Sequence, residues 1–333
     1  MRALVTGAAG FVGRWLTDAL RADGVAVTAL ALHERDAAAA TLAARPSSVP
    51  GATATAVPLA PITWAFGDLR DDAFVAQVVR DSVPTFVVHL AAISHLPTAA
   101  ADPATAWDTN VTATARLLHH LDRQRASGET DPTILVVGSA EQYGRQPSGR
   151  EPIAETAPQE PRTVYAATKA AQELLALQCW RATGLKVVVA RSFNHSGRGQ
   201  EPRFLLPALV SRALALRTAP AATPLTIGNT TPVRDFLHVS DVVAAYISLL
   251  RRGTPGEAYN VASGTGWSVQ AIVEHVLARA GVDAPIAVDP ALVRPVDVPA
   301  LVGNPAKLQQ STGWRAHRAF DDIIDDLIHA ATY

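Results

Sequence analysis

Tyr165 and Lys169 have residue types and a spacing suited to proton transfer. Residues at positions i and i+4 of a helix share one face, so the ammonium can lie close to the phenol. A phenol with a pKa of about 10 is a poor acid or base at neutral pH, and a nearby cation lowers that pKa by favouring the phenolate. The pair therefore predicts a tyrosine that exchanges a proton with a substrate.

A serine and a glutamate precede this pair at the end of an expected strand. Residues 134–138 (ILVVG) are a short apolar run typical of a buried strand, and Ser139 follows at its end. There its hydroxyl can supply a second hydrogen bond to the reacting oxygen. A serine-hydrolase interpretation fails because Gly138-Ser139 lacks the GxSxG pattern. Glu141 lies two residues further on.

The chain opens with a glycine-rich turn. An apolar run at residues 2–6 is followed at once by GAAGFVG, which begins an amphipathic stretch extending to Ala22. The first glycine suits a tight turn, the second lets the backbone approach a pyrophosphate, and the third lets the helix pack closely on the strand. Helix-start N–H groups then face the phosphates. The order strand, turn, helix predicts dinucleotide binding by Gly7, Gly10, Phe11, Val12 and Gly13. Alone, the YxxxK spacing is common in ordinary helices; preceded by this turn and Ser139, it favours catalysis.

Further apolar runs alternate with helical patterns along the first two thirds of the chain. They predict an α/β protein with a Rossmann-type doubly wound parallel sheet. A smaller, discontinuous C-terminal substrate lobe is expected beside it. We expect the dinucleotide-binding domain at residues 1–193 plus about 233–262, and the substrate lobe at about 194–232 plus 263–333. The expected strands are residues 2–6, 25–32, 64–69, 85–90, 134–138 and 186–191.

Side chains after these strands are candidates for cofactor contacts. The second strand ends in neutral residues with Arg35 close by, which favours NADP(H), although Glu34 and Asp36 keep NAD(H) possible. Asp68 could accept from the adenine amino group or cap the next helix. Asn110, in an expected helix at residues 103–125, either hydrogen-bonds a backbone bulge near the catalytic strand or is solvated. The remaining candidates are Leu69, Leu90, Ala91 and Ala92 for the cofactor and Ser94 for the substrate.

Composition limits the function classes. With 333 residues, 48% of them hydrophobic, the chain can bury one large core or two moderate ones. A net charge of -1 argues against nucleic acid or an anionic membrane as a partner. The single cysteine excludes an intrachain disulfide, and no metal site is expected. Without a signal peptide or a long apolar run, a cytoplasmic location is expected.

The motifs together resemble the extended short-chain dehydrogenase/reductases, the nucleotide-sugar epimerase and dehydratase superfamily. The segment RSFNHSGRGQ at residues 191–200 is similar to the GDP-sugar branch, above all to GDP-6-deoxy-4-keto-mannose reductases. Two departures are Arg198, where a proline is usual, and His238, which is commoner in epimerases. Further matches are SAEQYG at 139–144, VRDF at 233–236, RPVDVP at 294–299 and TGW at 312–314.

This resemblance implies a function. NADPH or NADH would deliver hydride to C4 of a GDP-4-keto-6-deoxy-hexose while Tyr165 protonates O4, Lys169 binds the nicotinamide ribose and Ser139 orients the carbonyl. The product would be of the rhamnose or talose type. A homodimer through the helices at 103–125 and 163–183 is expected. The substrate-binding candidates of the second half are Asn194, Phe204, Arg234 and Arg294, the two arginines as clamps on the diphosphate.

Three alternatives remain. Glu141 matches the carboxylate that removes the C5 proton in GDP-mannose 4,6-dehydratases, so a dehydratase is the first alternative to the reductase. A nucleotide-sugar 4-epimerase comes second. From another class, a non-catalytic dinucleotide sensor would use the same fold, but such proteins commonly lack the Tyr or the Lys.

Overall fold

The structure is a computed structural model that describes residues 1–36, 58–145, 151–220, 222–293 and 298–332. Contacts divide the chain into two compact units, each built from separate stretches of sequence. The sequence-based division into lobes is a division by function and stays a prediction. It differs most from the division by contacts at residues 140–162, which the sequence assigns to the dinucleotide-binding domain and the contacts group with the second unit. The first unit contains Met1–Ser139, Thr163–Arg191 and Val243–Tyr259, and the second contains Ala140–Arg162, Ser192–Val242 and Asn260–Tyr333.

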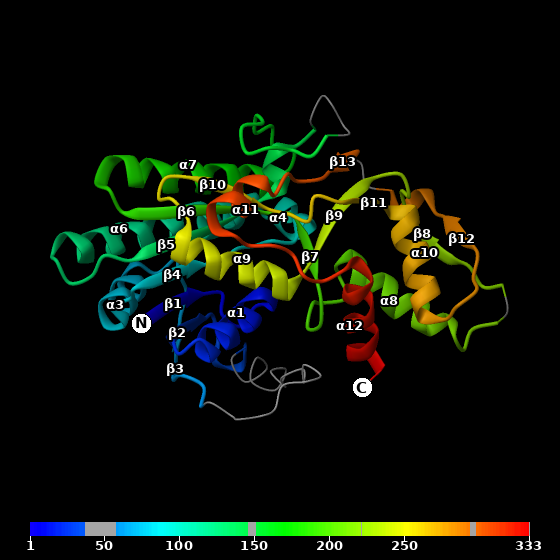
Figure 1. Ribbon diagram of the computed structural model, residues 1–333, viewed down its shortest axis with the longest axis horizontal. Coiled ribbons are helices and arrows are strands. Elements are labelled where there is room, and N and C mark those ends of the chain that lie inside the picture. Colours follow the sequence, from blue (N-terminus) through cyan, green and yellow to red (C-terminus); the bar gives the residue numbers. More distant parts are fainter. Residues whose placement is uncertain (37–57, 146–150, 221, 294–297, 333) are drawn as a thin grey trace. The chain divides into compact units, whose positions relative to one another are not determined.

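A seven-stranded sheet forms the centre of the first unit (Figure 1). Its order is β10-β6-β5-β4-β1-β2-β3, and the pairings from β3 through β1 to β5 are parallel. Six of these strands therefore follow the doubly wound order 3-2-1-4-5-6, and the predicted Rossmann-type fold is confirmed. The strands are β1 (Arg2–Thr6), β2 (Ala26–Ala31), β3 (Ile62–Phe66), β4 (Phe86–His89), β5 (Thr133–Ser139), β6 (Lys186–Ser192) and β10 (Ala258–Val261).

Both faces of this sheet are buried at its centre. Successive side chains of a strand point to opposite faces, and Ala3, Leu4 and Val5 of β1 are all almost fully buried. Such strands need a helical layer on each side, which is why they appear in the sequence as unbroken apolar runs. The helices of this unit include α1 (Phe11–Ala22), α3 (Asp72–Ser82), α6 (Ala113–Ala126), α7 (Val164–Thr183) and α9 (Val239–Arg252). A short helix, α4 (Leu96–Ala101), packs on α7.

The helix expected at residues 103–125 contains a wider turn. It runs as α5 (Pro103–Trp107), a π-helical turn η1 (Asp108–Thr112) and then α6. A π turn inserts one residue into the helical ladder and is frequent at functional sites. It contains Asn110, which is fully buried.

The second unit has its own apolar core. Helices α8 (Leu205–Leu216), α10 (Val269–Ala280) and α12 (Phe320–Thr332) pack against one another and beside β8 (Leu225–Ile227) and β12 (Ile286–Val288) (Figure 1). A second small sheet has the order β11-β9-β13, and β7 also pairs with β9. Its strands are β7 (Asn194–Ser196), β9 (Val233–His238), β11 (Gly266–Ser268) and β13 (Ala300–Leu301), and the remaining elements are η2 (Ala140–Tyr143), η3 (Pro290–Leu292) and α11 (Ala306–Thr312).

Among the described residues, none of the helices combines the length and the apolar character needed to cross a membrane.

Candidate functional site

The glycine-rich turn lies at the switch point of the sheet, between β1 and β4. Gly7 has φ +67°, and a Cβ there would lie 2.9 Å from the backbone nitrogen of Ala91. A Cβ on Gly13 would lie 2.2 Å from the carbonyl oxygen of Gly7. Because both neighbours are backbone atoms that cannot turn aside, these two positions accept only glycine. The close packing brings the residues after β4 against the turn after β1.

Gly10 is different and supports a dinucleotide site. It is exposed, and among the described residues outside its own chain neighbours the one atom within 4 Å of a Cβ built on it is the carbonyl oxygen of Gly7, at 3.1 Å. It precedes α1, in which Phe11 and Val12 are half-buried residues of the first turn. A bare backbone in front of a helix N-terminus offers N–H groups and a favourable dipole to phosphate oxygens. The residues present therefore fit a bound pyrophosphate.

Arg35 extends into solvent beyond the end of β2. Its side chain is 81% exposed, and its nearest carboxylate, on Asp36, is 4.0 Å away. Asp36 also accepts a hydrogen bond from the backbone N–H of His33. Such a weakly held guanidinium can turn toward a phosphate on the adenosine ribose.

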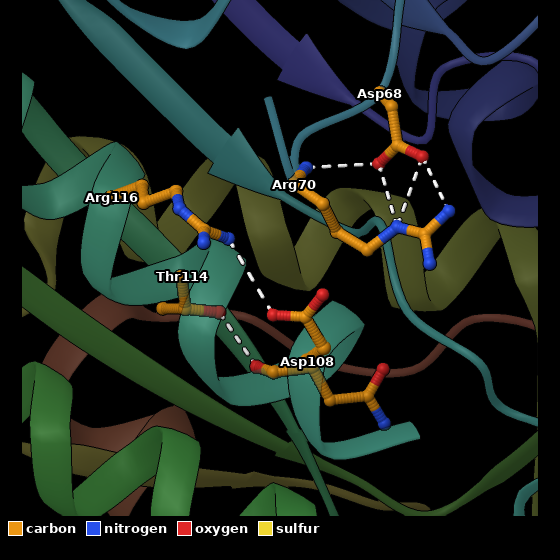
Figure 2. A network of polar contacts seen from close by, with 6 residues as sticks. Asp68, Arg70, Asp108, Thr114 and Arg116 are labelled. Atoms are coloured by element: carbon orange, nitrogen blue, oxygen red, sulfur yellow. Dashed lines mark hydrogen bonds and ion pairs between the residues drawn. The ribbon is translucent and has the colours of Figure 1, made fainter. Parts of the chain in front are cut away.

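Asp68 forms an ion pair at the end of β3 (Figure 2). Its two carboxylate oxygens accept from Arg70 side-chain nitrogens at 2.6 to 3.1 Å, and Oδ1 also accepts the Arg70 backbone N–H. These hydrogen bonds lower the pKa of Asp68. The cap of α3 is Asp71, which accepts from Ala73 and Phe74, so Asp68 does not cap that helix. Its contact with adenine stays a prediction, as does that of the half-buried Leu69.

A second ion pair, Asp108 to Arg116 at 3.6 Å, joins η1 to α6 (Figure 2).

Tyr165 lies in the first turn of α7. Thr163 caps this helix, its hydroxyl accepting the backbone N–H of Ala166 at 3.1 Å. Tyr165 is 9% exposed, and its ring belongs to an apolar cluster that contains Ala99 and Ala106 from α4 and α5. The helix start and the apolar cluster together fix the direction of the phenol.

Lys169 follows one turn later and is almost fully buried. Its Nζ donates to the carbonyl oxygen of Val137 at 2.7 Å and to Oε1 of Gln172 at 2.8 Å. Burial lowers the pKa of Lys169 to about 7. Val137 lies two residues before the buried Ser139 at the end of β5, so the structure brings the ammonium to the strand that carries the serine.

Asn110 holds the backbone of the segment that follows β4. Its Oδ1 accepts the N–H of Ile93 at 2.8 Å, and its Nδ2 donates to the oxygen of Ile93 and, at 2.9 Å, to the hydroxyl of Thr168. Because it is fully buried, the solvated alternative is excluded. Asn110 thus links α7, between Tyr165 and Lys169, to the strand end. Of the other residues in this segment, Leu90, Ala91 and Ala92 are half-buried and Ser94 is exposed.

The second unit contains the other candidate residues for the substrate and the fourth catalytic candidate, Glu141. Glu141 lies in η2, immediately after Ser139, and its carbonyl oxygen accepts from Gly144. Asn194 in β7 donates through Nδ2 to the oxygen of Asp235 at 3.2 Å. Arg234 in β9 donates to the oxygen of Val298 at 2.7 Å. These contacts fix both side chains, while their roles toward a substrate stay predictions.

Phe204 precedes α8 with the Arg203 guanidinium 5.5 Å from its ring centroid. Arg294 lies outside the described residues.

Arg198 and His238, the two departures from the reductase pattern, converge on Asp326 of α12. The backbone N–H of Arg198 donates to Oδ2 of Asp326 at 2.7 Å, and Nε2 of His238 lies 3.3 Å from the same oxygen. Burial raises the pKa of Asp326, but these contacts outweigh burial and leave it lowered. One carboxylate thus holds the loop after β7 and the end of β9.

Arg198→Pro should therefore destabilise the protein, whereas Arg198→Ala should not. Proline removes the N–H that Asp326 accepts and leaves a partly buried carboxylate short of one donor, a loss of about 1–3 kcal/mol. Alanine keeps the N–H. Urea unfolding of the two variants measures the difference. An equal loss of stability in both variants would show that the guanidinium, rather than the backbone contact, stabilises the protein.

Three buried polar residues of the first unit were not predicted from the sequence to belong to the site. His89, Thr114 and Gln172 are fully buried and hydrogen-bonded to one another or to Lys169. The signal was a histidine at the end of the apolar run TFVVH. Its partners are Thr6 of β1 and Thr114 of α6, 83 and 25 residues away, so no local pattern revealed them.

Comparisons with known proteins agree with this geometry. Residues 4–327 match the family model described as GDP-mannose 4,6 dehydratase. A GDP-6-deoxy-D-mannose reductase of Pseudomonas aeruginosa is 35% identical over 233 residues, 70% of this chain and 75% of that protein. A UDP-glucose 4-epimerase of Streptomyces lividans is 30% identical over 277 residues, 78% of this chain and 80% of that protein. The solved structure of RMD from Pseudomonas aeruginosa complexed with NADPH is similar with a TM-score of 0.79 and 28% identity, covering 100% of both chains.

Proposed function

Because this chain belongs to the GDP-mannose 4,6-dehydratase family of extended short-chain dehydrogenase/reductases, we propose that it reduces the C4 keto group of a GDP-4-keto-6-deoxy-hexose. The family makes it an NAD(P)-dependent oxidoreductase of nucleotide-sugar chemistry. The choice of reduction rests on the 35% identity to a GDP-6-deoxy-D-mannose reductase. The observation that carries a redox mechanism is the buried Lys169 ammonium, one helical turn from Tyr165 and bonded to the strand that ends in Ser139.

Each catalytic group has a defined role in the proposed reduction. A bound nicotinamide dinucleotide supplies the hydride that C4 receives. Tyr165 donates its phenolic proton to O4 as negative charge develops there, which removes the cost of a free alkoxide. The Lys169 ammonium stabilises the resulting phenolate by proximity and offers a hydrogen bond to the nicotinamide ribose. Ser139 donates a second hydrogen bond to O4 and so orients the carbonyl.

A dehydratase is the second candidate because of Glu141. A carboxylate directly after the serine strand matches the base that removes the C5 proton in a 4,6-dehydratase. The two activities differ in their use of hydride, since a reductase consumes NADPH whereas a dehydratase regenerates its NAD in each turnover. A 4-epimerase, the activity named for one relative, also regenerates its NAD.

One pair of incubations separates these activities. Purified protein is given NADPH with GDP-4-keto-6-deoxymannose, and separately GDP-mannose without added cofactor. We expect NADPH oxidation only with the keto sugar, and NMR of the product then gives the configuration at C4. Loss of water from GDP-mannose would instead identify a dehydratase.

We expect NADPH to be preferred over NADH through Arg35. Its exposed guanidinium is placed to pair with a 2′-phosphate, a charge-assisted contact worth about 1.5–3 kcal/mol. Arg35→Ala should therefore lower kcat/KM for NADPH about 10-fold to 100-fold. The same variant assayed with NADH is the control and should be unchanged. Equal effects on both cofactors would place Arg35 outside the 2′-phosphate site.

The expected homodimer is also a proposal. Trp107 on α5 is 43% exposed and Leu174 on α7 is 67% exposed, and these two helices pack on one another. Large apolar side chains on neighbouring helices are suited to contact with a second copy. Analytical ultracentrifugation measures the oligomeric state.

A further inference from the structure

A buried polar chain crosses the first unit and ends at Lys169. We name it the His89 chain, and each of its side chains is at most 3% exposed. Its residues come from β1, β4, α6 and α7, and its links measure 2.8 to 2.9 Å. In order, its members are Thr6, His89, Thr114, Gln172 and Lys169. Figure 2 shows Thr114, the middle member, near the Asp108–Arg116 ion pair.

Counting donors determines the direction of every hydrogen bond. The Thr114 hydroxyl gives its single hydrogen to the oxygen of Asn110 at 2.7 Å, so it must accept from both Gln172 and His89. His89 therefore has its hydrogen on Nε2. Its Nδ1 must then accept from the Thr6 hydroxyl, which in turn accepts the backbone N–H of Ala91 at 3.1 Å.

The chain is consistent only with a neutral His89. A second ring hydrogen on Nδ1 would face the Thr6 hydroxyl, whose own hydrogen would lose its acceptor. Burial, and secondarily the charge of Lys169, lowers the pKa of His89 to about 3, in agreement with this count. Both ring nitrogens are thus committed, which fixes the Thr114 oxygen as an acceptor.

With Thr114 fixed, the orientation of the Gln172 amide has no alternative. Its NH₂ must face Thr114, and its oxygen must face Lys169. That oxygen and the carbonyl of Val137 accept two of the three ammonium hydrogens, and the third is left for the phenol or the ribose. A buried ammonium without such acceptors would lose its proton readily.

The titratable groups that surround Lys169 are either neutral or paired, which leaves Gln172 as the side chain that controls the Lys169 ammonium. Tyr165 lies one turn away on the same helix, and His89 is neutral. Glu173 is paired with the buried Arg191 of β6, and Asp108 of η1 is paired with Arg116. Each of these carboxylates therefore has its own cation.

We propose that Gln172, oriented by Thr114 and His89, is a positioning residue that holds the Lys169 ammonium in place and in its charged form. The inference deepens the proposed function, because it assigns the group that prepares Lys169 for its task beside Tyr165. It also makes a physical connection to the cofactor turn, since Thr6 ends β1 directly before Gly7 and binds the backbone of Ala91.

The experiment measures the titration of Lys169 directly, without substrate or cofactor. The chain contains three lysines, Lys169, Lys186 and Lys307, so protein labelled with ¹³C at lysine Cε gives a spectrum that Lys169→Met assigns. Gln172→Glu should raise the midpoint of Lys169 by about 1–3 units, since a carboxylate replaces the amide oxygen. Gln172→Met, of similar size but without an acceptor, should lower it.

Variants of Thr114 test the rest of the chain. Thr114→Val removes the acceptor that orients the Gln172 amide, so the midpoint of Lys169 should fall. Thr114→Ser keeps the hydroxyl and should restore it. A role limited to packing would lower the melting temperature without moving the titration in opposite directions for Glu and Met. If Gln172→Met fails to fold, Gln172→Glu and the two Thr114 variants decide the outcome.

A Lys169 midpoint that is the same in wild type, Gln172→Glu and Thr114→Val would overturn the inference. The pH–rate profile with the keto sugar should shift in parallel with the NMR midpoint. If Lys169 shifts as expected but the keto sugar is not reduced, the proposed function fails and the positioning role stands. If the sugar is reduced but the Lys169 midpoint does not change in the variants, the proposed function stands and the positioning role of Gln172 fails.

Discussion

Tyr165→Phe should reduce kcat by about 100-fold to 10,000-fold while NADPH binding stays close to that of the wild type. The variant removes only the phenolic hydroxyl, so no proton donor for O4 remains on α7, whereas the ring still fills its apolar cluster with Ala99 and Ala106. Stopped-flow measurement of NADPH oxidation gives the chemical step, and fluorescence titration gives the Kd. The effect should lie in kcat with little change in KM.

Tyr259→Phe is the matched control. Tyr259 is buried in the same unit, and its hydroxyl accepts the backbone N–H of Thr254 at 3.1 Å. Removing that hydroxyl should cost about 1–3 kcal/mol of stability and leave kcat unchanged. A Tyr165→Phe protein that binds NADPH normally and turns over as the wild type does would refute catalysis by Tyr165. Wild-type protein that binds cofactor but never turns over would favour the dinucleotide sensor.

Gly13→Ala should destabilise the whole first unit by about 3 kcal/mol or more. The added methyl would lie 2.2 Å from the oxygen of Gly7 and 2.7 Å from Cα of Ala8, so α1 would have to move away from β1. Because α1 supplies the N-terminus that faces the phosphates, NADPH affinity should fall as well. Thermal unfolding with and without NADPH measures both effects.

Two other glycines separate packing from cofactor binding. Within the described part of the chain, the methyl of Gly10→Ala would meet one atom, at 3.1 Å, so we expect a nearly unchanged melting temperature and a large loss of NADPH affinity. Gly24→Asn is the control, since no described residue beyond its chain neighbours lies within 4 Å of a Cβ there and asparagine tolerates its φ of +75°. Unchanged NADPH affinity in Gly10→Ala would show that the pyrophosphate lies elsewhere.

The sequence alone was sufficient for the features that contiguous residues determine. The first strand and the first helix were predicted at residues 2–6 and 11–22, and the structure has β1 and α1 at those positions. The strand order that defines the doubly wound sheet was also within reach, because alternating apolar runs and helical stretches allow few other arrangements. Tyr165 and Lys169 share a face by helical periodicity alone.

The π turn inside the expected long helix could not be predicted from the sequence. Residues 103–125 read as one helix, but the π turn at Asp108–Thr112 widens it where Asn110 reaches the backbone of Ile93. The competing interaction comes from the segment that follows β4, and helical periodicity carries no information about it.

Only the tertiary structure revealed the distant partners of Lys169 and Arg198. Lys169 and Val137 are 32 residues apart, and Arg198 and Asp326 are 128 residues apart. His89 and Thr6, further along the His89 chain, are 83 residues apart. Local periodicity fixes which face of its own element a side chain occupies, but which distant side chain meets it depends on strand order and on how the helices pack. A buried polar group must find its acceptor wherever the fold provides one. For this reason helical spacing could identify the catalytic pair and even place Gln172 on the face of Lys169, whereas Val137, Thr114 and His89 could not be found from the sequence.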